Sequence, residues 1–159
     1  MKFARSPLAC RRAKKWNSGL DMQIIGYEGV GPIRFGMSRE DVRAALGTEF
    51  KSFKRSPSST QPCDHFYRHE CFVYYDAKGL VDAVEFAEPA TPTLDGLNLL
   101  GVSFTSLVER IMLTDPDLSV ESDGFTSTRL GIGGWAPAAD EEPDEPLKSI
   151  IVFSRGYYD

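Results

Sequence analysis

The same helix start occurs twice in this 159-residue chain, and the duplication restricts its fold more than any other feature of the sequence. Phe35-Gly36-Met37-Ser38 in the first half matches Leu100-Gly101-Val102-Ser103 in the second. In each copy the serine can cap the first turn of a helix by accepting a hydrogen bond from a backbone N–H. Asp41 lies three residues after the first serine, as in a capping box. We therefore predict two helices, each beginning directly after its serine.

The apolar residues that follow each serine have helical spacing. They are Val42, Ala45 and Leu46 in the first copy, and Leu107, Val108 and Ile111 in the second. Gly47 is a natural C-terminal stop, so the first helix should cover about residues 39–46. The second helix should end before Asp115-Pro116-Asp117, because the residue before a proline disfavours the helical conformation.

Runs of strand-forming residues follow both predicted helices. They are residues 50–55, 71–76 and 80–86 after the first helix, and residues 118–121, 125–132 and 148–154 after the second. Asp76-Ala77-Lys78-Gly79 is typical of a turn, so the runs on either side of it should form a β-hairpin. Asp123-Gly124 predicts a second turn.

The last strand of each half also matches, since Ala83-Val84-Glu85-Phe86 aligns with Ile150-Ile151-Val152-Phe153. Each unit would bury a helix against one face of a sheet, and two such units can share a core. We predict an α+β domain of two tandem helix-plus-antiparallel-strand repeats sharing a sheet and core, with repeat one at about 22–90 and repeat two at about 91–159. The alternative is that this order of elements is common and the matches arose by chance.

Residues 35–47 resemble the G-M-(S/T)-x-x-x-V-x-x-x-L-G helix of two related groups of proteins. These are the small outer-membrane-assembly lipoproteins and the β-lactamase-inhibitor proteins, the latter built from tandem helix-plus-sheet repeats. The resemblance implies a sheet that serves as a binding face. Both groups are exported, whereas this chain shows neither a signal peptide nor a lipidation site, so the inhibitors' target does not transfer. A looser analogy is a cytoplasmic immunity protein that neutralises a bacterial toxin.

Charge is distributed unevenly along the chain. Residues 1–21 carry six basic residues and one acidic residue, whereas the remainder carries twelve basic and 22 acidic residues, a net charge of −10. A surface of this sign repels nucleic acid, whose binding depends on neutralised phosphates. It favours a basic protein partner, because complementary charge speeds encounter. The simpler alternative is that the acidity serves only solubility.

The basic segment, residues 1–21, lacks the apolar core of a secretory signal. We expect a disordered tail or an extension before a second start at Met22, followed by one domain over 22–159. No apolar stretch is long enough to cross a bilayer, so no membrane association is expected. Three cysteines give no disulfide framework, and a reducing cytoplasm is the expected location.

The best candidate for a chemical site is the segment Cys63-Asp64-His65-Phe66-Tyr67-Arg68-His69-Glu70-Cys71. Thiolate and imidazole are the preferred ligands of zinc, so Cys63, His65, His69 and Cys71 form a candidate metal set or a nucleophile with its base. On a straight strand these side chains are too far apart to share a metal. A hairpin centred on Tyr67 would bring them together. The straight aromatic strand is the favoured prediction, because the spacing matches no usual zinc pattern.

The second candidate site is a surface for another protein. Asp140, Glu141, Glu142, Asp144 and Glu145 place five carboxylates in a proline-containing loop, where they must be solvated. Tyr75 and Trp135 are candidate exposed aromatic anchors beside it, since Tyr and Trp are enriched at interfaces. The alternative is a loop that only aids solubility.

These features together predict a non-enzymatic protein that binds a basic protein partner through its sheet and acidic loop, with neutralisation of a bacterial toxin as the concrete form. No cofactor is required by this function. The alternative is a small zinc-binding or hydrolytic protein that uses the segment from Cys63 to Cys71.

Overall fold

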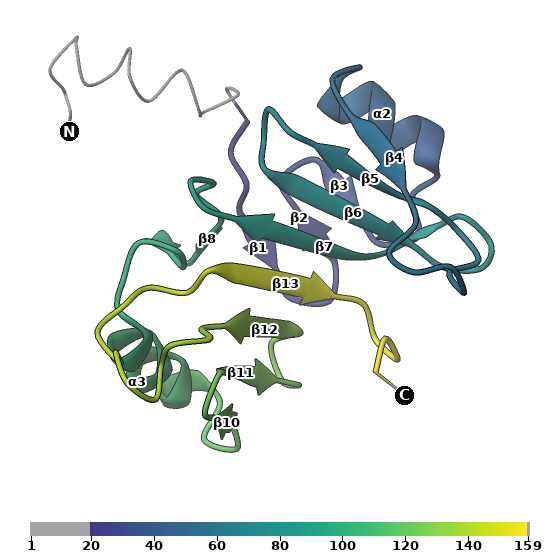
Figure 1. The fold of residues 1–159 in the computed structure, drawn as a ribbon. Helices are drawn as coiled ribbons and strands as arrows, with labels where there is room; N and C mark the ends of the chain where they lie inside the picture. Colours follow the sequence, from purple (N-terminus) through teal and green to yellow (C-terminus); the bar gives the residue numbers. More distant parts are fainter. Residues whose placement is uncertain (1–19, 159) are drawn as a thin grey trace, which may run out of the picture.

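An eight-stranded antiparallel sheet dominates the computed structural model, which describes residues 20–158 (Figure 1). Its strand order is β10-β11-β12-β13-β7-β6-β5-β4. The strands of the first half are β4 (Lys51–Phe53), β5 (Cys63–Phe66), β6 (Cys71–Tyr75) and β7 (Val81–Ala87). Those of the second half are β10 (Ser119–Glu121), β11 (Gly124–Ser127), β12 (Ile132–Trp135) and β13 (Ser149–Phe153).

The two halves of the sheet meet where β7 pairs with β13 in the centre, with Val84 opposite Val152. Each half is an antiparallel meander that follows one helix, α2 (Arg39–Leu46) or α3 (Phe104–Thr114). A small sheet of β1 (Ile24–Ile25), β2 (Gly29–Val30) and β3 (Ile33–Arg34) precedes α2. A two-stranded hairpin of β8 (Thr93–Leu94) and β9 (Leu97–Asn98) precedes α3. The described part of the chain is therefore an α+β fold, as predicted.

The predicted helix starts are confirmed. Ser38 caps α2, because its hydroxyl accepts a hydrogen bond from the Asp41 backbone N–H at 3.1 Å. Ser103 caps α3 in the same way, accepting from the Ser106 N–H at 3.1 Å. Gly47 ends α2 at a φ of 100°, where a side chain would be strained.

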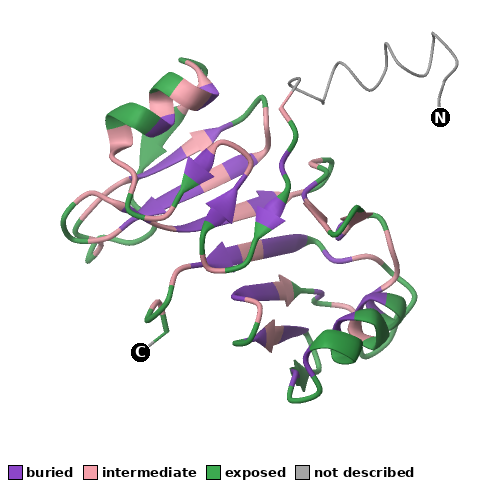
Figure 2. Cartoon of the chain, turned by 180° about the vertical axis from the view of Figure 1, so that it is seen from behind, coloured by how far each residue is buried: buried purple, intermediate pink, exposed green. Residues whose placement is uncertain are grey.

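Both helices bury their apolar side against the same face of the sheet, which we call the inner face. Val42 and Leu46 of α2, and Leu107 and Ile111 of α3, share one core with inward-facing strand residues such as Phe86. Figure 2, seen from behind, shows buried residues along the strands of the main sheet and exposed residues on the sides of the helices that face away from the sheet. The described residues contain no helix of the length and apolarity needed to span a bilayer.

Two strand predictions were wrong. Residues 125–132 form two strands instead of one, because a turn at Thr128–Leu130 and a positive φ of 72° at Gly131 reverse the chain. The segment from Cys63 to Cys71 is a hairpin instead of a straight strand. Its turn spans Tyr67–Glu70 and includes Glu70 at a φ of 47°. Residues other than glycine seldom adopt a positive φ, so the sequence gives no indication of this turn.

Candidate functional site: the outer face of the sheet

The face opposite the helices, which we call the outer face, has an aromatic surface. Because side chains alternate along a strand, residues such as Phe72 and Tyr74 of β6 point away from the helices while Val73 points toward them. Tyr74 and Phe153 form a small second core there with Cys63 and Ala83. Neither of the two helices in residues 20–158 packs on this second core.

Aromatic rings contact one another across the outer face. His65 stacks on Phe72 with ring centroids 4.0 Å apart, and Phe53 meets Phe72 edge-on at 6.3 Å. At the other end of this surface, Phe153 packs against Tyr157 and Tyr158 of the C-terminal turn, at 6.1 and 5.0 Å. Edge-on and stacked pairs of this kind contribute stabilisation in addition to that from the apolar area they bury.

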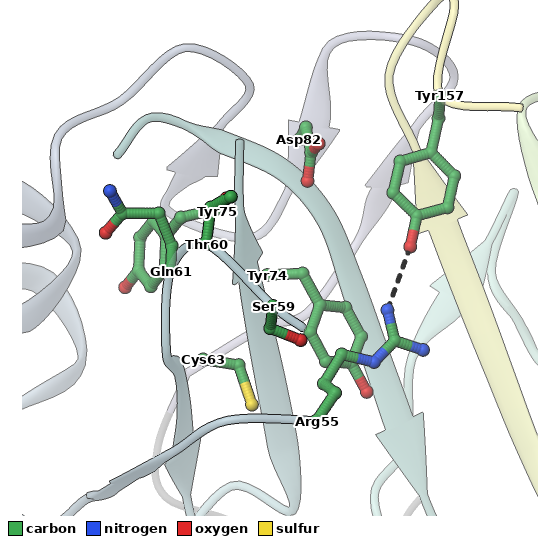
Figure 3. Close-up of a pocket in the computed structure, with 9 residues that line it drawn as sticks. All are labelled: Arg55, Ser59, Thr60, Gln61, Cys63, Tyr74, Tyr75, Asp82 and Tyr157. Carbon is green, nitrogen blue, oxygen red and sulfur yellow. Dashed lines mark hydrogen bonds between the residues drawn. The ribbon is translucent and has the colours of Figure 1, made fainter. Parts of the chain in front are cut away.

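A pocket of about 220 Å³ opens beside Tyr74 and Tyr157 (Figure 3). The loop after β4, strands β5 to β7 and the C-terminal turn provide its walls. The lining residues are Arg55, Ser59, Thr60, Gln61, Cys63, Tyr74, Tyr75, Asp82 and Tyr157. Sequence analysis did not identify this pocket, because its residues come from four separate segments.

Arg55 is held at the edge of the pocket by two tyrosines. Its guanidinium lies 4.0 Å from the centre of the Tyr74 ring and donates a hydrogen bond to the Tyr157 hydroxyl at 3.2 Å. The Tyr74 hydroxyl in turn donates to Glu85. Burial opposes the charge of Arg55, but the hydrogen bond to Tyr157 and the nearby Glu85 outweigh it and raise the pKa of Arg55.

Asp82 is the acidic group of the pocket. Burial and the neighbouring charge of Asp76 raise its pKa to about 6, because both disfavour a carboxylate. Cys63 also lines the pocket, and burial raises the pKa of its thiol, which disfavours the nucleophilic thiolate. The chemistry of these side chains therefore suits binding better than nucleophilic attack.

The candidate metal ligands do not converge. Cys63 and His65 lie on the outer face, whereas Cys71 is buried in the inner core. The hairpin register explains this, because Phe66 instead of Cys63 lies opposite Cys71. The histidines are used elsewhere: His65 contacts Glu70 at 3.0 Å, and His69 contacts the Leu46 carbonyl at 3.1 Å. The hairpin centred on Tyr67 that would join them is not formed.

Within residues 20–158 no three His, Cys, Asp or Glu side chains are grouped in a way that could hold a metal ion. The sequence-based zinc set of Cys63, His65, His69 and Cys71 therefore has no geometric support. Cys63 and Cys71 lie on opposite faces because Cys71 pairs with Phe66 on the inner side, whereas Cys63, three residues before Phe66, points to the outer side.

Tyr75 is not an exposed anchor, contrary to the prediction. Its side chain is on the inner side of β6 and is only 8% exposed. Its hydroxyl donates to Asp64 at 2.9 Å, and the Arg39 guanidinium lies 4.0 Å from its ring centre. The prediction failed because both faces of β6 are covered at this point: Tyr75 packs in the inner core, and Tyr74 on the outer face is equally buried at 8%.

Trp135 and the acidic loop are at the surface. The Trp135 side chain is 51% exposed at the end of β12, directly before the loop. All five carboxylate residues, Asp140, Glu141, Glu142, Asp144 and Glu145, are exposed. The loop lies against the start of α3, since the Phe104 N–H donates to the Glu145 carbonyl at 2.9 Å and the Thr105 N–H donates to the Pro143 carbonyl at 3.1 Å.

Sequence analysis also missed the part that Asp64 plays. Asp64 is completely buried and accepts hydrogen bonds from Arg43, Ser52 and Tyr75. Burial opposes its ionisation, but these hydrogen bonds outweigh burial and lower the pKa of Asp64. This cluster fastens α2 to the sheet and is not open to a ligand.

The predictions for residues 1–19 of the basic segment lie outside the described residues. Comparison of the whole chain with protein-family models, with curated proteins and with solved structures gives no match.

Proposed function

We propose that this protein binds another protein through the outer face of its sheet and the adjoining acidic loop, and that its partner is basic. The observation that carries the proposal is the aromatic outer face. Phe53, Trp135 and Tyr158 are 42%, 51% and 64% exposed, respectively. Large exposed aromatic rings are costly to leave in water, and they are the side chains that most often anchor interfaces.

The acidic loop supports a basic partner. Its five carboxylates follow Trp135 in the chain, so charge and an aromatic anchor are available on neighbouring segments. Charged residues at the rim of an interface mainly raise the association rate, and their effect falls with salt. Neutralisation of a basic bacterial toxin, by an immunity protein in the cytoplasm, is the concrete form of the function that we propose.

We further propose that the two halves are tandem repeats. The support is the shared order of a capped helix followed by four antiparallel strands, together with the matched helix starts at Gly36 and Gly101. In such an arrangement the central β7 and β13 strands would be equivalent, and their outer sides would form one continuous binding face.

The test is recovery of a partner by the full-length protein, followed by mapping of the contact. We expect a basic protein to co-purify, and amide hydrogen exchange to slow on β6, β7, β12 and the acidic loop when it binds. Trp135→Ala and a variant with all five loop carboxylates replaced by their amides should each weaken binding at least tenfold.

Leu113→Ala is the matched control, since Leu113 is 86% exposed on α3, on the helical side of the sheet. It should leave the affinity unchanged. Native affinity of both the Trp135 and the loop variants, or protection confined to helices α2 and α3, would reject the proposed interface.

A further inference from the structure

The pocket on the outer face contains a carboxylate that no other side chain neutralises. The register between β6 and β7 shifts at Tyr74 and Tyr75, which pair with Ala83 and Val81, so Asp82 between them has no opposite residue. Irregularities of this kind redirect a side chain out of the regular ladder. In Figure 3 the Asp82 carboxylate points toward the space bounded by Tyr74, Arg55 and Tyr157.

No side chain in residues 20–158 donates a hydrogen bond or forms an ion pair with Asp82. Half-buried carboxylates are normally paired, because an unpaired charge loses hydration without compensation. Its own backbone N–H and the charge of Arg55 favour the ionised form of Asp82, but Arg55 is already engaged with Tyr74 and Tyr157. Asp82 is therefore free to receive a ligand.

The surroundings of the pocket favour a cation. One positive group, Arg55, is outnumbered by the three carboxylates of Asp76, Asp82 and Glu85. The pocket is lined by tyrosine rings, whose faces attract cations, and by the hydroxyls of Ser59 and Thr60, which can accept hydrogen bonds. One face of the Tyr74 ring is already covered by the Arg55 guanidinium, so the ring is available to a ligand only for contacts with the ligand's methylene groups.

We propose that this pocket binds an alkylammonium group, which pairs with the Asp82 carboxylate and packs its methylene groups against Tyr74 and Tyr157. A volume of about 220 Å³ suits one compact ammonium head with a short chain. The ammonium group can belong to a lysine side chain of a protein or to a free amine. The pocket lies on the same outer face as the proposed protein interface, but neither Trp135 nor a residue of the acidic loop lines it, so the two sites can be tested with different variants.

Binding should depend on the ionisation of Asp82. Burial and Asp76 place the pKa of Asp82 at about 6, whereas Arg55 lowers it. Burial raises the pKa of both Cys63 and Tyr74, which also line the pocket, so they remain neutral at that pH. Protonation removes the counter-ion, and a bound ammonium in turn favours the ionised form. The ammonium should therefore bind at pH 7.5 and be released at pH 5.

The experiment is a titration of the isotopically labelled full-length protein, monitored by NMR through its amide chemical shifts. The two probes, used separately, are n-butylamine and Nα-acetyl-lysine methylamide, whose side-chain ammonium is free. We expect saturable shifts at Cys63, Tyr74 and Asp82 at pH 7.5, with at least tenfold weaker binding at pH 5. Asp82→Asn should also weaken binding at least tenfold, whereas Asp140→Asn in the exposed loop should not change it.

Saturation by only the lysine derivative assigns the pocket to a protein side chain, and saturation by only butylamine assigns it to free amines. Trp135→Ala should bind either probe normally, which distinguishes failure of this pocket from failure of the proposed Trp135 anchor. Absence of saturable shifts at pH 7.5 with both probes, or binding by Asp82→Asn within twofold of the native chain, would overturn the proposal.

Discussion

Arg43 holds Asp64 through two parallel hydrogen bonds, with Nε 3.1 Å from Oδ2 and Nη2 3.0 Å from Oδ1. The arginine belongs to α2 and the aspartate to β5, so this pair joins helix to sheet. Bidentate pairing is the strongest geometry available to an arginine and a carboxylate. Asp64 is fully buried while the Arg43 side chain is 34% exposed, so loss of the aspartate should affect stability more than loss of either arginine.

Asp64→Asn should lower the free energy of unfolding by about 3 kcal/mol, because it removes the charge that Arg39 and Arg43 share and leaves mismatched buried polar groups. Urea denaturation at pH 7 measures this loss. Glu40→Gln, on the exposed side of the same helix, is the control and should change stability by less than about 0.5 kcal/mol. Equal stability of Asp64→Asn and the native chain would show that the cluster does not fasten α2.

The contribution of Asp64 should disappear in acid. Its pKa in the folded chain is below the ordinary value of 3.8, so its stabilising effect is complete above that value and is lost as the pH falls through the lower, folded pKa. The difference in stability between Asp64→Asn and the native chain should therefore be constant from pH 7 to pH 5 and shrink below pH 3.8. Denaturation series at several pH values test this, and a difference independent of pH would contradict it.

Asp82→Asn should stabilise the protein at neutral pH. The folded pKa of Asp82, about 6, exceeds the ordinary value of 3.8, so folding disfavours the ionised form. The penalty is absent below pH 3.8, grows as the pH rises toward 6 and is complete above it. After allowance for solvent screening we expect a gain of about 1 kcal/mol at pH 7.5 and none at pH 3.5. A gain of the same size at both pH values would contradict the assignment.

Gly124→Ala should destabilise the protein by about 3 kcal/mol or more, because a Cβ at this position would lie 2.1 Å from the Gly134 carbonyl oxygen of the paired strand. Gly133→Ala on β12 is the matched control. A Cβ there would lie 3.3 Å from the Ile151 side chain and 3.5 Å from the nearest backbone atom, which small shifts can accommodate. Thermal unfolding of both variants compares them, and equal melting temperatures would rule out the backbone clash.

Cys71 should resist thiol reagents in the native protein. Its side chain is fully buried, and burial raises the pKa of its thiol. Cys63 and Cys71 lie on opposite faces and should form no disulfide with each other. In a Cys10→Ser background, reaction with a thiol reagent should therefore modify Cys71 only after denaturant is added. Rapid native labelling of Cys71, or a bond between Cys63 and Cys71, would show that the hairpin register differs.

Local sequence patterns were sufficient for the helices and their caps. Ser38 and Ser103 accept hydrogen bonds from N–H groups only three residues away, and Gly47 supplies a positive φ within its own residue. The hairpin of β6 and β7 follows equally from residues 71–86. These features depend on neighbours in the chain, so the sequence by itself determined them, together with the α+β class and the exposed acidic loop.

Only the tertiary structure decided the candidate sites. The register of β5 against β6 placed Cys63 and Cys71 on opposite faces, and the alternation along β6 placed Tyr75 in the inner core and Tyr74 in the small core of the outer face. The pocket itself requires Arg55, Asp82 and Tyr157 to meet from distant segments. Because side chains alternate with a period of two, a shift of one residue in pairing moves a side chain from core to surface. Local sequence identified most of the strand-forming runs, but the packing of the whole sheet decided where the chain reverses and which side chains face a ligand.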